Sequence, residues 1–221
     1  MQKSKQTNKV LTAALLAGTM LTTPVVAAEI SGNVGATTDY IWRGNTQSSG
    51  DASLSGGIDV DFGNGFAVGT WVGSLGASDS DDANYEVDLY GSYSFEGPFS
   101  GLSYEIGYIS YQYPGVANSD ADFSDIYVSI GTGPFSVSYY ILEDAKDADV
   151  DADDGTYLSL DAEFPLSEDW SVALHYGLEE YDISEDDEDY AISLSKGDMS
   201  FTVSGDEGDD TRAIISWGAS F

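Results

Sequence analysis

The 221-residue chain has 39 acidic and only 7 basic side chains, which gives a formal charge of −32 at pH 7. This balance excludes nucleic acid as a partner, because contacts with phosphates need a basic surface. The absence of cysteine excludes disulfide and thiol chemistry, and an aromatic content of 13% argues against the disorder that acidity alone would suggest.

The first 28 residues predict a secretory signal peptide. Lys3, Lys5 and Lys9 precede a mostly apolar stretch over residues 10–23, and small residues then lead to a cleavage site after Ala28. A short membrane anchor is the weaker alternative, because the apolar stretch is shorter than the ~20 residues of a spanning helix. We expect one exported domain over residues 29–221 that passes through the periplasm.

Apolar and polar residues alternate directly after this segment, with the period of a β-strand. Over residues 30–43 the apolar face is predicted to contain Ile30, Val34, Ala36, Tyr40 and Trp42, and the polar face to contain Arg43. The same alternation predicts further strands over residues 54–62, 66–75, 86–95, 102–112, 123–131, 135–142, 157–164, 170–181, 190–196 and 199–204.

A final alternating segment covers residues 211–221, and its apolar face includes Ile215, Trp217 and Phe221. Bacterial outer-membrane barrels typically end on such a strand, which pairs with the first strand. Phe221 is therefore the predicted barrel-closing terminus. The total of about twelve strands is even, as expected for a single-chain barrel of this class.

The connections between the predicted strands alternate in length. Short turns rich in Gly, Asn and Pro fall at residues 63–65, 96–98, 131–134, 165–169 and 196–198. Longer or more acidic connections fall between them, at residues 43–51, 76–83, 114–122, 143–154, 183–189 and 205–210. Short periplasmic turns and longer external loops are the barrel pattern.

These patterns predict an all-β fold: a single antiparallel up-and-down transmembrane β-barrel, with apolar side chains toward lipid. A soluble β-sandwich or jelly roll also has short alternating strands. It would, however, fill a core where this sequence places Ser, Gly, Thr and Asp, and it would not sort its connections by length.

Several segments carry a family resemblance. The start of the TorF family of porins is similar to residues 31–76, SGNVGATTDYIWRGNTQSSGDASLSGGIDVDFGNGFAVGTWVGSLG. Later stretches of that family resemble, in the same order, EVDLYGSYSF, LSYEIGYISYQYPGV, GPFSVSYY and GTYLSLDAEFPLSEDWSVALHYG. The resemblance covers essentially the whole mature chain. It implies a Gram-negative outer-membrane barrel of the porin type, with no catalytic or ligand residues to carry over.

Carboxylates on the polar face are predicted to line a pore, and rings of such groups attract cations and repel anions. These side chains are Asp59, Asp61, Glu86, Asp88, Glu105, Asp125, Asp161, Glu163 and Glu179, with Arg43 and Arg212 as the cations on the same face. We expect a narrow channel for passive diffusion of small hydrophilic solutes, favouring cations. The alternative is a non-conducting structural or surface-binding barrel whose lumen is filled by Tyr90, Tyr140 and the loops.

His175 is the single histidine and falls on the polar face. An outer-membrane hydrolase would need it beside a nucleophile and an acid, which makes an enzyme a remote alternative. A hydrogen bond from His175 to a nearby lumen carboxylate is the favoured interpretation.

The acidic segment over residues 144–155 invites a calcium interpretation. Asp149, Asp151 and Asp153 have the spacing that opens an EF-hand loop, but Asp154 stands where glycine is needed and Leu160 where glutamate is needed. We therefore expect no cofactor and no metal site. Loose divalent binding is a weak alternative to a solvated acidic surface suited to high salt.

The partners expected from these patterns are outer-membrane lipid, the barrel-assembly machinery during biogenesis and the permeating solute. Among the four tryptophans, Trp42, Trp170 and Trp217 are predicted near the membrane interface. Trp71 is predicted on the lumen side. No segment marks an oligomer interface.

Overall fold

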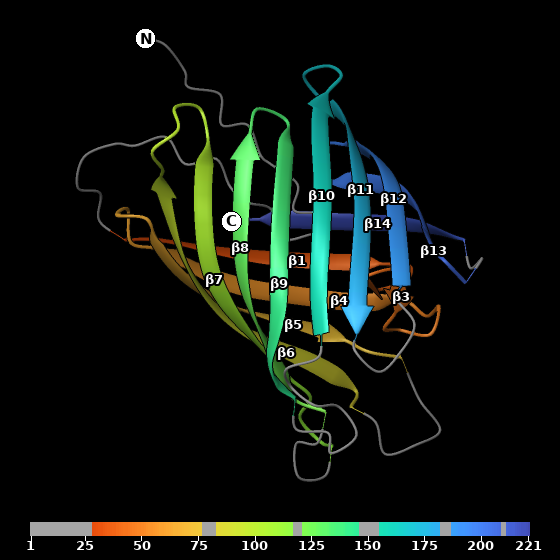
Figure 1. Cartoon of the computed structure of the whole chain (residues 1–221). Coiled ribbons are helices and arrows are strands. Elements are labelled where there is room, and N and C mark those ends of the chain that lie inside the picture. Colours follow the sequence, from red (N-terminus) through yellow and green to blue (C-terminus); the bar gives the residue numbers. More distant parts are fainter. Residues whose placement is uncertain (1–27, 77–82, 117–120, 146–154, 182–186, 209–210) are drawn as a thin grey trace.

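Two short strands and the twelve strands of a closed barrel make up the secondary structure of the computed structural model, which describes residues 28–76, 83–116, 121–145, 155–181, 187–208 and 211–221 (Figure 1). The predicted signal peptide, apart from Ala28, lies outside these ranges, as do Asp149, Asp151 and Asp153. Within the described ranges, no helix is long and apolar enough to cross a membrane.

The barrel strands follow the predicted segments closely. They are β1 (Glu29–Thr37), β4 (Ser53–Asp61), β5 (Phe66–Ser74), β6 (Tyr85–Glu96), β7 (Ser103–Gln112), β8 (Phe123–Thr132), β9 (Phe135–Ala145), β10 (Gly155–Pro165), β11 (Trp170–Tyr181), β12 (Asp187–Lys196), β13 (Met199–Asp206) and β14 (Arg212–Ser220). Each of these strands pairs antiparallel with its neighbours in the barrel. The short strands β2 (Ile41–Trp42) and β3 (Asn45–Thr46) form a separate sheet.

The barrel closes where the last strand meets the first. β14 pairs antiparallel with β1, with Ala36 opposite Trp217, and β1 pairs on its other side with β4. The backbone of Phe221 exchanges two hydrogen bonds of 2.9 Å with that of Gly32. The predicted closure is therefore confirmed, and the barrel sheet has no free edge.

The structure also agrees with the predicted pattern of short turns at one end of the barrel and longer or more acidic connections at the other. One end of the barrel has the tight turns at residues 62–65, 133–134, 166–169 and 197–198, together with the turn at 97–102. Gly63, Gly65, Gly133 and Gly197 adopt the positive φ angles that such turns require. The other end has the longer connections, including residues 38–52 and 113–122.

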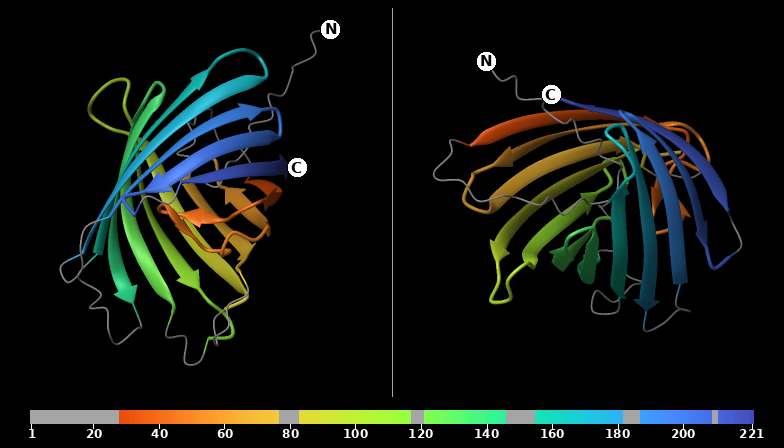
Figure 2. Two further views of the ribbon diagram at one scale, coloured as in Figure 1. Left: turned by 90° about the vertical axis from the view of Figure 1, so that its right-hand side faces the viewer. Right: turned by 90° about the horizontal axis from the view of Figure 1, so that it is seen from above.

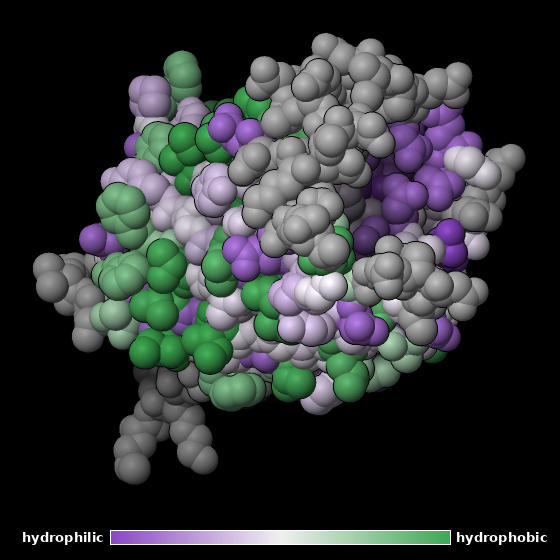
Figure 3. Space-filling model, turned by 90° about the horizontal axis from the view of Figure 1, so that it is seen from below, coloured by the Kyte–Doolittle hydropathy of each residue, from purple (hydrophilic) through white to green (hydrophobic). Residues whose placement is uncertain are grey.

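The polarity of the barrel wall is the reverse of that of a soluble protein. Every barrel strand exposes large apolar side chains on the outside, among them Ile30, Leu54, Val68, Leu89, Ile106, Val128, Ile141, Leu160, Leu174, Ile192, Phe201 and Ile215. The buried side chains are mostly polar, including Ser53, Glu86, Ser124, Asp125, Ser129, Ser138, Ser159, Glu179, Asp189, Ser193, Ser200 and Ser204. Seen from the end with the longer connections, hydrophobic residues are spread over the outer surface and hydrophilic residues gather at one side (Figure 3).

The sandwich alternative is therefore wrong for this chain. A sandwich would bury Leu89 and Ile215 between two sheets, whereas these side chains are 46% and 49% exposed on the outside of a single closed sheet.

Candidate functional site

The connection between β1 and β4 folds into the barrel as a hairpin. β2 and β3 pair Ile41 with Thr46 and Trp42 with Asn45, which leaves Arg43 and Gly44 as a two-residue turn. Both turn residues have positive φ, 46° and 78°, as a tight hairpin of the type I′ kind needs. Figure 2 shows this orange hairpin inside the curve of the barrel wall. The turn therefore holds Arg43 in the interior of the barrel.

The base of the hairpin is fixed by polar contacts around Asp39. The Asp39 carboxylate accepts hydrogen bonds from the hydroxyl groups of Thr46, at 2.6 Å, and Ser48, at 2.9 Å. The Ser48 hydroxyl in turn accepts the backbone N–H of Tyr40 at 2.8 Å. Asp39 also lies 3.9 Å from the guanidinium of Arg212 on β14, so the base of the hairpin is held against the barrel wall.

The hairpin corrects two expectations from the sequence. Tyr40 and Trp42 do not continue the outward face of β1; their rings lie inside, with Tyr40 5.3 Å from Trp71 and Trp42 5.7 Å from Phe123. Arg43 does not begin an external loop. The physical reason is that the chain leaves the barrel sheet after Thr37, so the alternation beyond that residue no longer reports which side of the wall a residue faces. The contact with Tyr40 agrees with the lumen position predicted for Trp71.

Arg43 forms the central contact between the hairpin and the barrel wall. Its guanidinium pairs with Asp125 on β8 at 2.5 Å and with Glu179 on β11 at 2.9 Å. The same group lies over the rings of Trp42, Tyr157 and Tyr140, at 4.2, 4.5 and 5.4 Å from their centroids. Each cation–π contact contributes roughly 0.5–2 kcal/mol when desolvated. Arg43 thus ties the hairpin to two strands that are far apart in the sequence.

Charge and burial act in opposite directions on Arg43. Burial alone would lower the pKa of the guanidinium, but the charges of Asp125 and Glu179 outweigh it and raise that pKa. Burial, followed by the charge of Glu86, raises the pKa of Tyr40 well above its ordinary value. Tyr40 therefore keeps its proton, and its hydroxyl donates a hydrogen bond of 2.9 Å to Glu86.

The predicted pore carboxylates mostly lie on the inner wall with polar partners. Asp59 accepts hydrogen bonds from Tyr90, at 2.5 Å, and Asn33, at 3.3 Å. Glu105 accepts from Ser94 and Tyr127, both at 2.7 Å.

Three of the predicted carboxylates differ from this pattern. Asp61, at the end of β4, accepts the backbone N–H of Gly63 in the adjoining turn. The side chain of Glu163 is exposed close to the end of β10. Asp88 is near Glu86 and carries a buried oxygen without a hydrogen-bond partner. The inner wall is therefore densely acidic, but its carboxylates do not form a single ring.

His175 lies between two carboxylates of the inner wall. Its Nδ1 is 2.7 Å from Asp161 on β10, and its Nε2 is 2.9 Å from Asp189 on β12. The Tyr157 hydroxyl is 2.9 Å from the same Nε2 and donates to Asp189 at 2.9 Å. The expectation of a lumen histidine that is hydrogen-bonded to a carboxylate is confirmed. Both ring nitrogens are engaged, which leaves neither free to activate a nucleophile.

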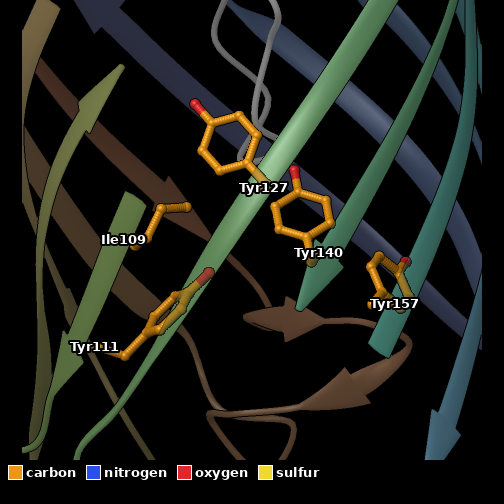
Figure 4. Packing of buried hydrophobic residues seen from close by; sticks show 5 residues of the cluster. All are labelled: Ile109, Tyr111, Tyr127, Tyr140 and Tyr157. Carbon is orange, nitrogen blue, oxygen red and sulfur yellow. The ribbon is translucent and has the colours of Figure 1, made fainter. Parts of the chain in front are cut away.

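Buried tyrosines from successive strands form an aromatic row on the inner wall (Figure 4). Tyr127 on β8 and Tyr140 on β9 are directly paired in the sheet, with ring centroids 5.2 Å apart. Tyr157 on β10 follows at 6.0 Å from Tyr140, and His175 lies 6.5 Å beyond it. Tyr111 on β7 packs against Trp42 of the hairpin. The hairpin therefore covers this row, and Arg43 lies on two of its rings.

Asp189 is a buried inner-wall residue that was not predicted from the sequence. The sequence predicts an external connection over the acidic residues 183–189. In the structure, β12 already begins at Asp187, and Asp189 is buried beside His175. The alternation of Tyr190, Ile192 and Leu194, all exposed on the outside, was the available signal, because it assigns the odd-numbered residues to the inside.

Among the described residues, no group of three or more His, Asp or Glu side chains could hold a metal ion.

The comparisons with known proteins agree with this architecture. A family model described as "Bacterial protein of unknown function (Gcw_chp)" matches residues 22–210. A solved structure described as "KdgM porin" is 17% identical and superposes with a TM-score of 0.56, over 86% of this chain and 99% of that one. A second, "KdgM porin in complex with disordered oligogalacturonate", is 15% identical with a TM-score of 0.55, over 88% and 99% of the two chains. At these identities the likeness shows a shared fold. No curated protein matches the sequence.

Proposed function

We propose that this chain, which belongs to the Gcw_chp family of bacterial proteins of unknown function, is an outer-membrane channel for the passive diffusion of small solutes. The observation that carries the proposal is the reversed polarity of the closed barrel. An apolar outer wall is stable against acyl chains, and a closed sheet leaves no backbone group unpaired in the hydrocarbon region. A polar, acidic inner wall suits a water-filled interior.

Aromatic side chains at the end with the tight turns support the membrane location. Phe66, Tyr93, Phe95 and Tyr104 form a continuous row of ring contacts across β5, β6 and β7, with centroids 4.4–5.7 Å apart. Aromatic girdles at the interface are typical of outer-membrane barrels. This end would face the periplasm, because tight turns lie on that side in such barrels.

The acidic inner wall favours cations over anions. Asp59, Glu105, Asp161 and Glu179 make their contacts on the inner wall, and Arg43 and Arg212 are the cations predicted on the same face. One of the structural relatives is in complex with oligogalacturonate, whose carboxylates this wall would repel. We therefore infer that the solutes are cationic or neutral. We also propose that the chain is related to the TorF family and that the barrel-assembly machinery delivers it to the outer membrane.

A non-conducting barrel is the second candidate, and the inward hairpin favours it. The hairpin fills part of the interior and is tied to β8 and β11 through Arg43. A hydrolase is disfavoured, because both nitrogens of His175 are engaged by carboxylates and a phenol.

Planar-bilayer recording of the refolded protein separates the first two candidates. We expect small conductance steps, with a reversal potential in a potassium chloride gradient that favours potassium. Replacing Asp59 and Glu105 with Asn and Gln should shift that potential toward zero, because both carboxylates lie on the inner wall away from the Arg43 contacts. A protein that inserts without steps is the non-conducting barrel, and a potential that favours chloride contradicts the inferred selectivity.

A further inference from the structure

The guanidinium of Arg43 lies in a cage of carboxylates and aromatic rings. We call the five side chains that surround it the cation cage: Asp125, Glu179, Trp42, Tyr140 and Tyr157. Only Trp42 belongs to the hairpin; the other four come from β8, β9, β10 and β11. The barrel wall thus presents two carboxylates and two rings to a cation that a loop carries into it.

The cage matches the chemistry of a planar organic cation. The two terminal nitrogens of Arg43 contact different carboxylates, at 2.5 and 2.9 Å, so that each carboxylate takes one edge of the guanidinium. The rings of Trp42 and Tyr157 lie within 4.5 Å of its central carbon. Planar guanidinium groups use both kinds of contact, through forked hydrogen bonds at the edge and stacking on the face.

The charges of the cage are not balanced within it. The side chains of Asp125 and Glu179 are only 1% and 8% exposed, and Arg43 brings one positive charge to these two carboxylates. A second Asp125 oxygen is buried without a hydrogen-bond partner. Without Arg43, two buried carboxylates would share one pocket of rings, an arrangement that strongly favours a cation.

The cation itself is held on a strained turn rather than on the rigid wall. Arg43 has a φ of 46°, in the left-handed region that non-glycine residues rarely adopt. Such backbone conformations persist at sites where the surrounding contacts impose them. Displacement of Arg43 from the cage therefore requires a change in the hairpin but none in the strands of the wall.

We propose that the cation cage is a binding site for solutes that carry a guanidinium group or a similar planar cation, and that Arg43 is its tethered occupant. A solute enters by displacing Arg43, and the hairpin then loses its main contact with β8 and β11. The inference deepens the proposed function, since the channel supplies the route by which such a solute reaches the cage.

The test uses Arg43→Ala, which empties the cage, and methylguanidinium chloride as the probe. The refolded full chain in detergent is unfolded by heat, and the folded fraction is followed by the gel mobility that distinguishes a folded barrel from a boiled one. We expect millimolar methylguanidinium to raise the unfolding midpoint of Arg43→Ala saturably, because a ligand that binds only the folded state stabilises it. Sodium chloride at the same ionic strength should have no such effect.

Three comparisons sharpen this result. Wild-type protein should show a smaller shift, because Arg43 competes for the cage. Arg212→Ala is the matched control: it removes the same charge from a more exposed position, with a side chain 26% exposed and 3.9 Å from Asp39, and should show no larger shift than the wild type. Adding Asp125→Asn and Glu179→Gln to Arg43→Ala should abolish the shift.

An absent shift in Arg43→Ala, or an equal shift in Arg212→Ala, overturns the proposal. Arg43→Gln serves as a second variant that retains more of the side-chain volume. If neither Arg43 variant folds at any methylguanidinium concentration, the proposal also fails, since it predicts rescue by the probe. This titration does not depend on conductance. Saturable binding to a barrel that does not conduct would reject the channel and support the cation cage as a binding site. Conductance without binding would support the channel and reject the cation cage as a binding site.

Discussion

Individual residues on the inner wall make side-chain contacts between neighbouring strands, and His175 shows this most clearly. Its imidazole bridges Asp161 on β10 and Asp189 on β12 from a position on β11 between them. Asp189 is 7% exposed, whereas Asp161 is 33% exposed, so solvent screens one contact more than the other. We therefore expect His175 to stabilise this part of the wall rather than to carry chemistry.

His175→Ala should lower the free energy of unfolding by about 1–3 kcal/mol, because it removes hydrogen bonds from a buried carboxylate. A urea titration of the refolded barrel measures this loss, with Glu163→Gln, an exposed carboxylate near the end of β10, as the control that leaves stability unchanged. Purified wild-type protein should not hydrolyse phospholipid. Hydrolysis that disappears in His175→Ala would instead establish the enzyme alternative.

At the scale of the strands, several inward tyrosines lie over a glycine of the neighbouring strand. Tyr127 on β8 is paired with Gly107 on β7, and a methyl group at Gly107 would overlap the tyrosine ring. The aromatic row of the inner wall therefore depends on where the glycines fall. Gly91 on β6 differs, since a methyl group there would meet its nearest atoms at an ordinary 3.6 Å.

Gly107→Ala should therefore cost about 1–3 kcal/mol of stability through overpacking, since Tyr127 must leave its position beside Tyr140. Gly91→Ala should be neutral or slightly stabilising, because it restricts the unfolded chain without a clash. Urea midpoints of the two refolded variants give the comparison. Equal midpoints would show that Tyr127 is not held over Gly107.

The strands could be predicted because their alternation is imposed by two different surroundings. Apolar side chains are needed on the outer side of each barrel strand and polar side chains on the inner side. The sequence of each strand therefore alternates with a period of two, as in the segment from Val87 to Phe95. The inward hairpin could not be predicted in the same way. Tyr40 and Trp42 keep the alternating pattern although the chain has already left the sheet, and their partners Trp71 and Phe123 are distant in sequence.

The candidate site was predicted in part for the same reason. Alternation assigns Asp125 and Glu179 to the inside, but the contact of both with Arg43 depends on the closure of the barrel and on the Arg43-Gly44 turn. The bulge between Ser124 and Asp125 adds a local shift in register that period-two counting does not reveal. The sequence therefore predicts which side chains face the interior, whereas the ion pairs between these side chains can be identified only in the folded barrel.

At the scale of the whole molecule, the proposed channel requires that the outer side of the wall meets lipid. The four tryptophans report on both sides: Trp170 and Trp217 are 38% and 42% exposed on the outside, whereas Trp42 and Trp71 contact Phe123 and Tyr40 in the interior. Variants that retain one tryptophan each, with phenylalanine at the other three positions, make each location separately measurable.

The most direct test is fluorescence quenching of these four variants in vesicles of lipids with brominated acyl chains. We expect strong quenching of Trp170 and Trp217 and little quenching of Trp42 and Trp71, relative to vesicles of unbrominated lipid. Strong quenching of the interior pair, or none of the outer pair, would contradict a barrel with its apolar wall against the membrane and its acidic wall around a water-filled interior.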